Sequence, residues 1–203
     1  MKTWKKIVAA AGAAGLALSL AACGSNSAED ANKLVVGASP SPHAQILRYV
    51  ADNLAEKQGI QLEVKEYTDY IQPNEALNSG DLVATYFLTV PYFDDVSAKN
   101  NCQFEHGEGI HLEPLGIYSE KIKDIKDVKD GAKIGIINDT TNQARALKLL
   151  ADKGLIKLPQ DEKQQLVSVI AKSKEYNPRG FELSEVEGPQ LVRSLADLDI
   201  AVI

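Results

Sequence analysis

The residues of this sequence best suited to binding a small molecule follow four apolar stretches. Segments 39–43, 68–70 and 87–89 supply hydroxyls and aromatic rings, and segment 138–142, followed by Arg145, supplies amides, hydroxyls and one guanidinium. Open α/β sheets bind ligands beyond the carboxyl ends of their strands, so residues at such ends are expected to meet in one crevice. The sequence therefore predicts a ligand site built from segments that are far apart along the chain.

The segment that ends at Asn142 favours an anionic group. A helix beginning there offers free backbone N–H groups and the positive end of its dipole to a carboxylate. Arg145 could add two parallel hydrogen bonds to the same anion, and Asn142 could accept from an ammonium or donate to a carboxylate. Tyr70 and Phe87 would enclose an apolar side chain, because small-molecule sites are lined mostly by apolar groups. Together these residues predict an amino-acid pocket.

A simpler interpretation of the same residues stays open. Asn, Asp and Thr commonly cap helices, so Asn142 and its neighbours could do only that, with Arg145 on the solvated face of the helix. Tyr70 and Phe87 could belong to the core, where aromatic side chains near strand ends commonly pack. The convergence of several segments on one sheet edge favours the pocket.

The elements that would position these residues alternate between strand-like and helix-like runs, a pattern that predicts an α/β fold with a mostly parallel sheet. Strands are expected at 33–38, 60–64, 82–87, 132–137, 181–186 and 200–203. Helices are expected to begin near Pro42, Pro73, Pro91 and Pro189. Two further helices are expected from their apolar faces, one with Ile122, Ile125 and Val128 and the other with Leu147, Leu150 and Ala151. In the helix after Pro42, the face with Leu47, Val50, Ala51 and Leu54 is expected to pack on the sheet.

Composition narrows the class of protein. The chain has 203 residues, 44% of them hydrophobic, and a formal net charge of −6, which argues against nucleic acid as a partner. The sequence contains no G-x-S-x-G, no H-E-x-x-H, no phosphate-binding glycine loop and no dinucleotide-binding glycine motif after a strand. We therefore expect no catalytic residue, no enzymatic activity and no cofactor.

A metal site is a further possibility at residues 105–113. His106 and His111 lie there among Glu105, Glu108 and Glu113, and histidine with carboxylate binds zinc. A separation of five residues places the two histidines on opposite faces of a regular strand. The spacing thus favours solvated loop residues, and no metal site is predicted.

The N-terminus has the layout of a signal peptide. Three lysines precede residue 7, an apolar run covers residues 7–20, and small residues lead to Cys23. Residues 20–23 read Leu-Ala-Ala-Cys, which resembles the bacterial lipoprotein signal, in which the cysteine is lipidated before cleavage. We expect residues 1–22 to be removed, Cys23 to carry the lipid anchor, and residues 23–32, rich in small and polar residues, to form a flexible tether.

The C-terminal residues 200–203 form an apolar strand that no turn or polar tail follows. A two-lobed binding fold requires the chain to return to its first lobe. The sequence is therefore interpreted as truncated at the C-terminus.

Several motifs, in order, resemble the NLPA family of substrate-binding lipoproteins. They are Gly-Ala-Ser-Pro-Ser-Pro-His-Ala at 37–44, Tyr-Thr-Asp-Tyr at 67–70 with Gln-Pro-Asn at 72–74, Tyr-Phe at 86–87 with Pro-Tyr at 91–92, His-Leu-Glu-Pro-Leu-Gly-Ile-Tyr-Ser at 111–119, Asn-Asp at 138–139 with Thr-Asn at 141–142, and Arg-Ala-Leu at 145–147. The resemblance covers the chain from Lys33 to Ile203. The best-known members of this family bind methionine for an ABC importer.

The resemblance implies a two-lobed periplasmic-binding-protein-like fold of type II, with lobe I at residues 33–115 and lobe II at 116–203. A lipid-anchored member on the extracytoplasmic side of the cell membrane would deliver an amino acid to an ABC permease and its ATPase. By matching position, Tyr70, Phe87 and Tyr92 would hold the ligand side chain. Arg145 would hold the ligand carboxylate, and Asn142 its polar end.

The ligand is less closely defined, because Leu88 and Thr89 stand where the family usually has Gln-His. Thr89 replaces a histidine of the methionine pocket, so another amino acid or a short peptide is also a candidate. Two further alternatives remain: a surface lipoprotein that acts as an adhesin or interaction module without transport, and a metal-binding lipoprotein.

Overall fold

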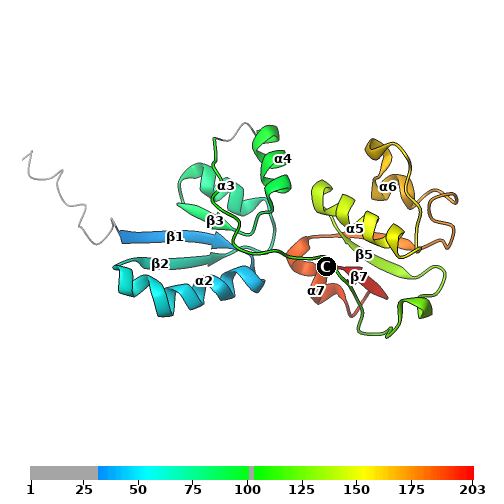
Figure 1. Ribbon diagram of the computed structural model, residues 1–203, viewed down its shortest axis with the longest axis horizontal. Helices are drawn as coiled ribbons and strands as arrows, with labels where there is room; N and C mark the ends of the chain where they lie inside the picture. The colour runs from blue at the N-terminus through cyan, green and yellow to red at the C-terminus, as the bar shows by residue number, and fades with distance from the viewer. Residues whose placement is uncertain (1–31, 101–102) are drawn as a thin grey trace, which may run out of the picture.

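The computed structural model describes residues 32–100 and 103–203, and it forms two α/β lobes (Figure 1). The predicted signal peptide, Cys23 and the tether lie outside the described residues, apart from Asn32. No helix within the described ranges combines the length and the apolar character needed to cross a bilayer. We call the lobe around the N-terminal sheet lobe I and the other lobe II.

Lobe I contains a three-stranded parallel sheet in the order β2-β1-β3. Its strands are β1 (Lys33–Ala38), β2 (Gln61–Glu66) and β3 (Ala84–Tyr86). Helical turns over Pro40–Ala44 and Ala51–Ala55 extend α2 (Gln45–Val50) on both sides, and Glu56–Gln58 forms its last turn. The helices α3 (Gln72–Ser79) and α4 (Val90–Asn100) follow.

Local sequence explains where these helices begin and end. Pro73 lies in the first turn of α3, where the N–H that proline lacks has no helical partner anyway. Gly59 and Gly80 end their helices in the left-handed conformation, with φ of 70° and 85°, which glycine adopts without steric cost. The predicted apolar face after Pro42 is only partly buried: Leu47 and Val50 are half-buried, but Leu54 is 50% exposed, contrary to expectation.

Lobe II contains a four-stranded sheet in the order β4-β7-β5-β6. Its strands are β4 (Ile117–Tyr118), β5 (Lys133–Ile137), β6 (Glu182–Val186) and β7 (Ile200–Val202). β5 pairs in parallel with β6 and β7, and β4 pairs antiparallel with β7. The helices of this lobe are α5 (Thr140–Asp152), α6 (Val167–Ile170) and α7 (Leu191–Ser194).

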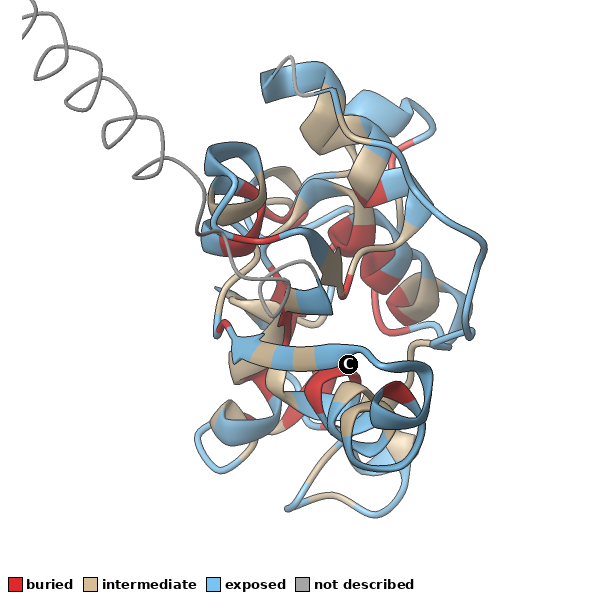
Figure 2. Ribbon diagram, turned by 90° about the vertical axis from the view of Figure 1, so that its left-hand side faces the viewer, coloured by how far each residue is buried: buried red, intermediate tan, exposed pale blue. Residues whose placement is uncertain are grey.

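The largest hydrophobic core lies between the sheet of lobe II and α5. Ile134 and Ile136 of β5 pack with Leu147 and Leu150 of α5, and all four are fully buried. Figure 2 shows buried residues between the sheets and their helices, while outer helix surfaces are exposed. The apolar period of α5 therefore predicted the face that packs.

One predicted helix is wrong. Ile122, Ile125 and Val128 were expected on one helix, but only a short turn of 3-10 helix forms, at Ile125–Asp127. The carboxylate of Asp124 accepts from the backbone N–H of Lys126, and Val128 is already extended, so the segment cannot continue as a helix. A spacing of three residues also fits the three-residue turn of a 3-10 helix.

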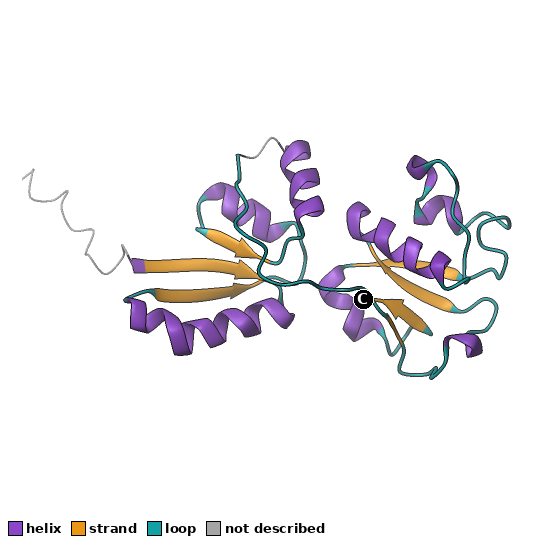
Figure 3. Ribbon diagram, in the orientation of Figure 1, coloured by secondary structure: helices purple, strands orange, loops and turns teal. Residues whose placement is uncertain are grey.

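The carboxyl ends of the strands in lobe I point toward lobe II (Figure 3). A loop that includes residues 103–116, which we call the crossover segment, leads from lobe I into β4. Backbone hydrogen bonds join Gly116 at its end to Ile203 beyond β7. The exact boundary between lobes at residues 115 and 116 stays a prediction.

Candidate functional site

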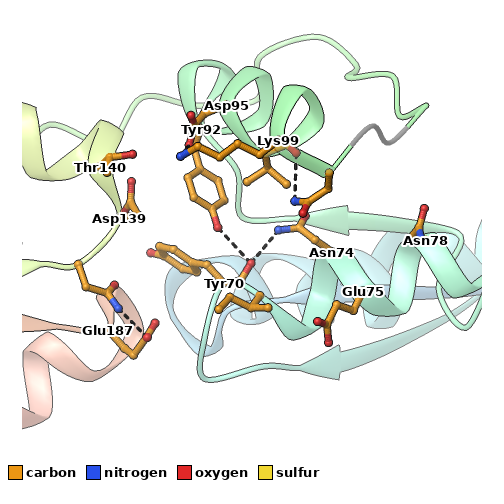
Figure 4. Close-up of a pocket in the computed structure, with 14 residues that line it drawn as sticks. Tyr70, Asn74, Glu75, Asn78, Tyr92, Asp95, Lys99, Asp139, Thr140 and Glu187 are labelled. Atoms are coloured by element: carbon orange, nitrogen blue, oxygen red, sulfur yellow. Dashed lines mark hydrogen bonds and ion pairs between the residues drawn. The ribbon is translucent and has the colours of Figure 1, made fainter. Parts of the chain in front are cut away.

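A pocket of about 630 Å³ lies between the lobes (Figure 4). Lobe I contributes residues from the turn before α3, from α3 and from α4: Tyr70, Ile71, Asn74, Glu75, Asn78, Tyr92, Asp95, Val96, Lys99 and Asn100. Lobe II contributes residues that follow β5 and β6: Asn138, Asp139, Thr140 and Glu187. The lobe II residues all lie just after the carboxyl ends of strands, where the sequence predicted a site.

Three aromatic side chains form one wall of the pocket region. The ring of Tyr70 lies 5.2 Å from that of Phe87 and 5.7 Å from that of Tyr92, between centroids, and Phe87 lies 6.4 Å from Tyr92. Tyr70 and Tyr92 line the pocket, and Phe87 packs behind them, 6% exposed. The predicted aromatic residues are therefore brought together, although they come from three different segments.

Hydrogen bonds to one backbone carbonyl fix this wall. The Tyr92 hydroxyl and the Asn74 side-chain amide both donate to the carbonyl of Tyr70, at 3.2 and 2.7 Å. Burial and the nearby Asp139 carboxylate raise the pKa of Tyr92 to about 12, and the same causes raise the pKa of Tyr70. Both phenols therefore keep their protons to a higher pH than an exposed tyrosine does.

The predicted polar residues lie at the start of α5. The carboxylate of Asp139 caps this helix by accepting from the backbone N–H of Asn142, and the Asn142 side-chain amide donates to the same carboxylate. Arg145 donates to the Asn142 side-chain oxygen at 2.8 Å and to the backbone carbonyl of Glu113 at 3.1 Å. These contacts give the Asn142 oxygen the role of acceptor.

Not every predicted residue reaches the pocket. Asn142 is buried and Arg145 is exposed, and neither is among the lining residues. Thr89 is half-buried before α4, does not line the pocket, and contributes a backbone carbonyl that accepts from the N–H of Phe93. The structure thus brings Asn142 next to Arg145, and Tyr70 next to Phe87 and Tyr92, as two separate groups.

The sequence reasoning did not assign most of the lining residues to the site, and Glu187 and Asn74 are two of them. Glu187 follows β6 directly and accepts from the Asn138 side chain at 2.6 Å, so the strand-end rule applied to β6 would have found it. Asn74 is 8% exposed, and its side-chain oxygen has no hydrogen-bond partner among residues 32–100 and 103–203. Its place in the Gln-Pro-Asn motif at 72–74 and in the first turn of α3 was the signal available for it.

Tyr70 also connects the two lobes. It packs on a small cluster in lobe II, formed by Ile137, Leu191, Leu198 and Ala201. Gly188 makes room for it, because a Cβ atom there would lie 2.6 Å from the Tyr70 hydroxyl oxygen. Tyr70 of lobe I therefore lines the pocket while its ring is seated against lobe II.

Two α/β lobes with a pocket between them define the fold of a two-lobed binding protein, and the predicted fold class is confirmed by solved structures. The chain belongs to the NlpA lipoprotein family, whose family model matches residues 34–203. The family predicted from the sequence motifs is therefore confirmed.

Sequence comparison with named lipoproteins supports membership of the same family. The probable D-methionine-binding lipoprotein MetQ of Vibrio cholerae is 34% identical over 205 residues, covering 100% of this chain and 74% of that protein. The methionine-binding lipoprotein MetQ of Bacillus subtilis is 38% identical over 175 residues, covering 85% of this chain. This chain spans 62% of the length of the Bacillus subtilis protein.

Solved structures agree with the sequence comparison. A putative lipoprotein from Actinomyces odontolyticus is 53% identical, with a TM-score of 0.72 over 84% of this chain and 69% of that chain. A nutrient binding protein from Burkholderia cenocepacia, solved bound to methionine, is 35% identical, with a TM-score of 0.70 over 84% of this chain and 70% of that chain.

Proposed function

We propose that the chain is a membrane-anchored substrate-binding lipoprotein of an ABC importer. It captures methionine, a related amino acid or a short peptide between its lobes and delivers it to the permease and its ATPase. The observation that carries the proposal is the pocket lined from both lobes, since such a pocket can close by hinge motion. We include methionine among the ligands because relatives are named as methionine-binding lipoproteins and one solved relative was bound to methionine.

The two groups of residues take different parts of the ligand in this proposal. Tyr70, Phe87 and Tyr92 offer an apolar surface for the ligand side chain, with Phe87 supporting the other two rings. Asp139 and Glu187 give the lobe II wall negative charge, which suits the ligand ammonium group.

Arg145 receives the ligand carboxylate. Its guanidinium now donates to Asn142 and to the carbonyl of Glu113, two neutral acceptors. A carboxylate is a stronger acceptor, because charge-assisted bonds are roughly twice as strong as neutral ones. If the guanidinium exchanged these two acceptors for the ligand carboxylate, Asn142 would be free to contact the polar end of the ligand. Thr89 would shape the end of the side-chain pocket.

The anchor is Cys23 in this proposal. Its support is the Leu-Ala-Ala-Cys motif at residues 20–23 and membership of a lipoprotein family. Two acyl chains or more are needed for stable anchoring, because a single chain gives only marginal membrane binding. The binding protein would then be held on the extracytoplasmic side of the cell membrane.

Calorimetry tests ligand binding directly. The full chain is unfolded and refolded to remove bound ligand, then titrated with both enantiomers of methionine, the other amino acids and methionine dipeptides. We expect Arg145→Ala to weaken binding by about 3 kcal/mol, roughly a hundredfold, because two charge-assisted hydrogen bonds are lost. The exposed Arg193 of α7 supplies the matched control, Arg193→Ala, which leaves affinity unchanged.

Absence of binding to every one of these ligands would contradict the proposal and favour a surface-interaction role. Equal affinity of Arg145→Ala and the unmodified chain would instead overturn only the assignment of the ligand carboxylate to Arg145.

A further inference from the structure

Two histidines and a glutamate meet outside the pocket, where the crossover segment passes lobe I. Nε2 of His111 lies 2.9 Å from a carboxylate oxygen of Glu113, and Nε2 of His43 lies 3.5 Å from the same oxygen. The three side chains bring one ligand atom each within 4.8 Å of one another. His43 follows β1, so the group joins the sheet of lobe I to a segment about seventy residues later in the chain.

Each histidine ring is held by its other nitrogen. The Ser39 hydroxyl lies 2.6 Å from Nδ1 of His43, and the Tyr86 hydroxyl lies 2.8 Å from Nδ1 of His111. Both partners are themselves at strand ends, Ser39 after β1 and Tyr86 at the end of β3. Histidines that bind metals typically have their second nitrogen hydrogen-bonded in this way, which fixes the tautomer and the ring orientation.

The group also has the access to solvent that a metal needs. Side-chain exposure rises from 8% at His43 to 29% at His111 and 41% at Glu113, so solvent reaches one side of the group. An ion could enter from that side and keep a water molecule there.

We propose that Nε2 of His43, Nε2 of His111 and the carboxylate of Glu113 bind one divalent transition-metal ion of the zinc class. Two ligands bound at about 2.0–2.2 Å in tetrahedral geometry lie roughly 3.3–3.6 Å apart. The observed separations of 2.9 and 3.5 Å from the Glu113 oxygen need only a small adjustment to reach that spacing. Two histidines and one carboxylate, with water in the fourth position, form a known zinc ligand set.

This site differs from the one that the sequence spacing suggested and disfavoured. His106 is not part of it: its ring packs edge-on against Phe93, with centroids 5.2 Å apart, and its Nδ1 lies 3.0 Å from the Gly107 carbonyl. The partner of His111 is His43, which the sequence places in a strand-end segment and in a family motif but not near a second histidine. The ion would fasten the crossover segment to the strand ends of lobe I.

Cobalt titration tests the site, because tetrahedral Co²⁺ absorbs strongly in the visible range. The full chain in detergent is first stripped with a chelator, and circular dichroism checks that each variant is folded. We expect one Co²⁺ per chain, displaced by Zn²⁺. His111→Gln and Glu113→Gln remove exposed ligands and should weaken binding by more than about a hundredfold, whereas Tyr86→Phe should weaken it about tenfold.

His106→Gln is the matched control and should bind Co²⁺ as tightly as the unmodified chain, since the third histidine of the sequence lies outside the group. Undiminished binding by folded His111→Gln would overturn the proposal. So would a thiolate-to-cobalt charge-transfer band, which would place the ion at a cysteine, or no binding by the folded unmodified chain. None of these readouts depends on amino-acid binding, so the proposed function is tested separately.

Discussion

The two lobes bury their apolar residues in different places. In lobe II, Ile134, Leu147 and Leu150 are fully buried between β5 and α5. In lobe I, α2 has no buried residue, and Tyr49 within it and Leu54 in the turn after it are 64% and 50% exposed. The buried aromatic residues Phe87 and Tyr92 of lobe I lie instead near the carboxyl end of its sheet, beside the pocket. Lobe I thus places buried aromatic side chains at the site, whereas the largest core of lobe II lies behind it.

The walls that the lobes give to the pocket differ in chemistry as well. Lobe I supplies the aromatic and aliphatic lining residues Tyr70, Ile71, Tyr92 and Val96 beside polar ones, whereas the lining residues of lobe II, Asn138, Asp139, Thr140 and Glu187, are all polar. Apolar side chains select a ligand by size and shape, and polar ones select charged groups by hydrogen bonding. Neither wall alone encloses an amino acid, so affinity should depend on contact between the lobes.

The largest expected effect concerns packing. Leu150→Ala removes a fully buried side chain and should lower the free energy of unfolding by about 2–5 kcal/mol. Leu54→Ala makes the same chemical change on the exposed side of lobe I and should change it by less than about 0.5 kcal/mol. Urea unfolding followed by circular dichroism measures both. Equal losses for the two variants would show that the lobes are packed alike in solution.

The next effect concerns the contact between the lobes. Gly188→Ala would place a Cβ atom 2.6 Å from the Tyr70 hydroxyl oxygen and 2.7 Å from Cδ1 of Ile137. Relief of such overpacking costs about 1–3 kcal/mol, so methionine affinity should fall about tenfold if both lobes close on the ligand. Gly107→Ala is the control, since nothing lies within 4 Å of its added Cβ. Calorimetry on both variants measures their affinity for methionine.

The Gly188→Ala variant could also contradict the contact between the two lobes. Affinity unchanged in Gly188→Ala would mean that Tyr70 leaves its seat against lobe II when ligand binds. If affinity falls instead, the double variant Gly188→Ala with Tyr70→Phe, which lacks the closest atom, shows whether the clash at the hydroxyl causes the loss of affinity.

Much of this arrangement could be predicted because it depends on local pattern. Gly59 and Gly80 mark helix ends through their backbone freedom, and Leu147 and Leu150 mark the buried face of α5 through their period. The nearness of Tyr70 to Phe87 follows from the strand-end rule, which needs only the strands and their direction. Tyr92 of α4 was predicted only by the resemblance to the family.

What could not be predicted depends on long-range contacts. β4 has two residues, and it is a strand because it pairs with β7, more than eighty residues away. Likewise, His43 meets His111 only because the crossover segment returns past the end of β1. The exposure of Leu54 and the absence of a helix at Ile122 have the same origin, since tertiary contacts and side-chain capping override the apolar period.

The smallest expected effect is one of pH, and it separates a buried tyrosine of the pocket wall from an exposed one in lobe II. The pKa of Tyr92 is raised to about 12, from the ordinary value of about 10, chiefly by burial. Above about pH 10 the unfolded chain loses this proton while the folded protein keeps it. The free energy of unfolding should therefore fall as pH rises from about 10 to about 12.

Tyr92→Phe removes this contribution together with the hydrogen bond to the Tyr70 carbonyl, which is worth about 1 kcal/mol. Below about pH 10 the unmodified chain should be the more stable of the two, and the difference should shrink as pH rises. Tyr118→Phe, at a tyrosine of β4 that is 51% exposed, is the control. Urea unfolding at a series of pH values measures all three. The free energies of unfolding of the unmodified chain and of Tyr92→Phe, plotted against pH, could instead stay parallel up to about pH 12. Tyr92 would then be as open to water as Tyr118. In that case the pocket wall in lobe I is not the closed aromatic surface that distinguishes it from lobe II.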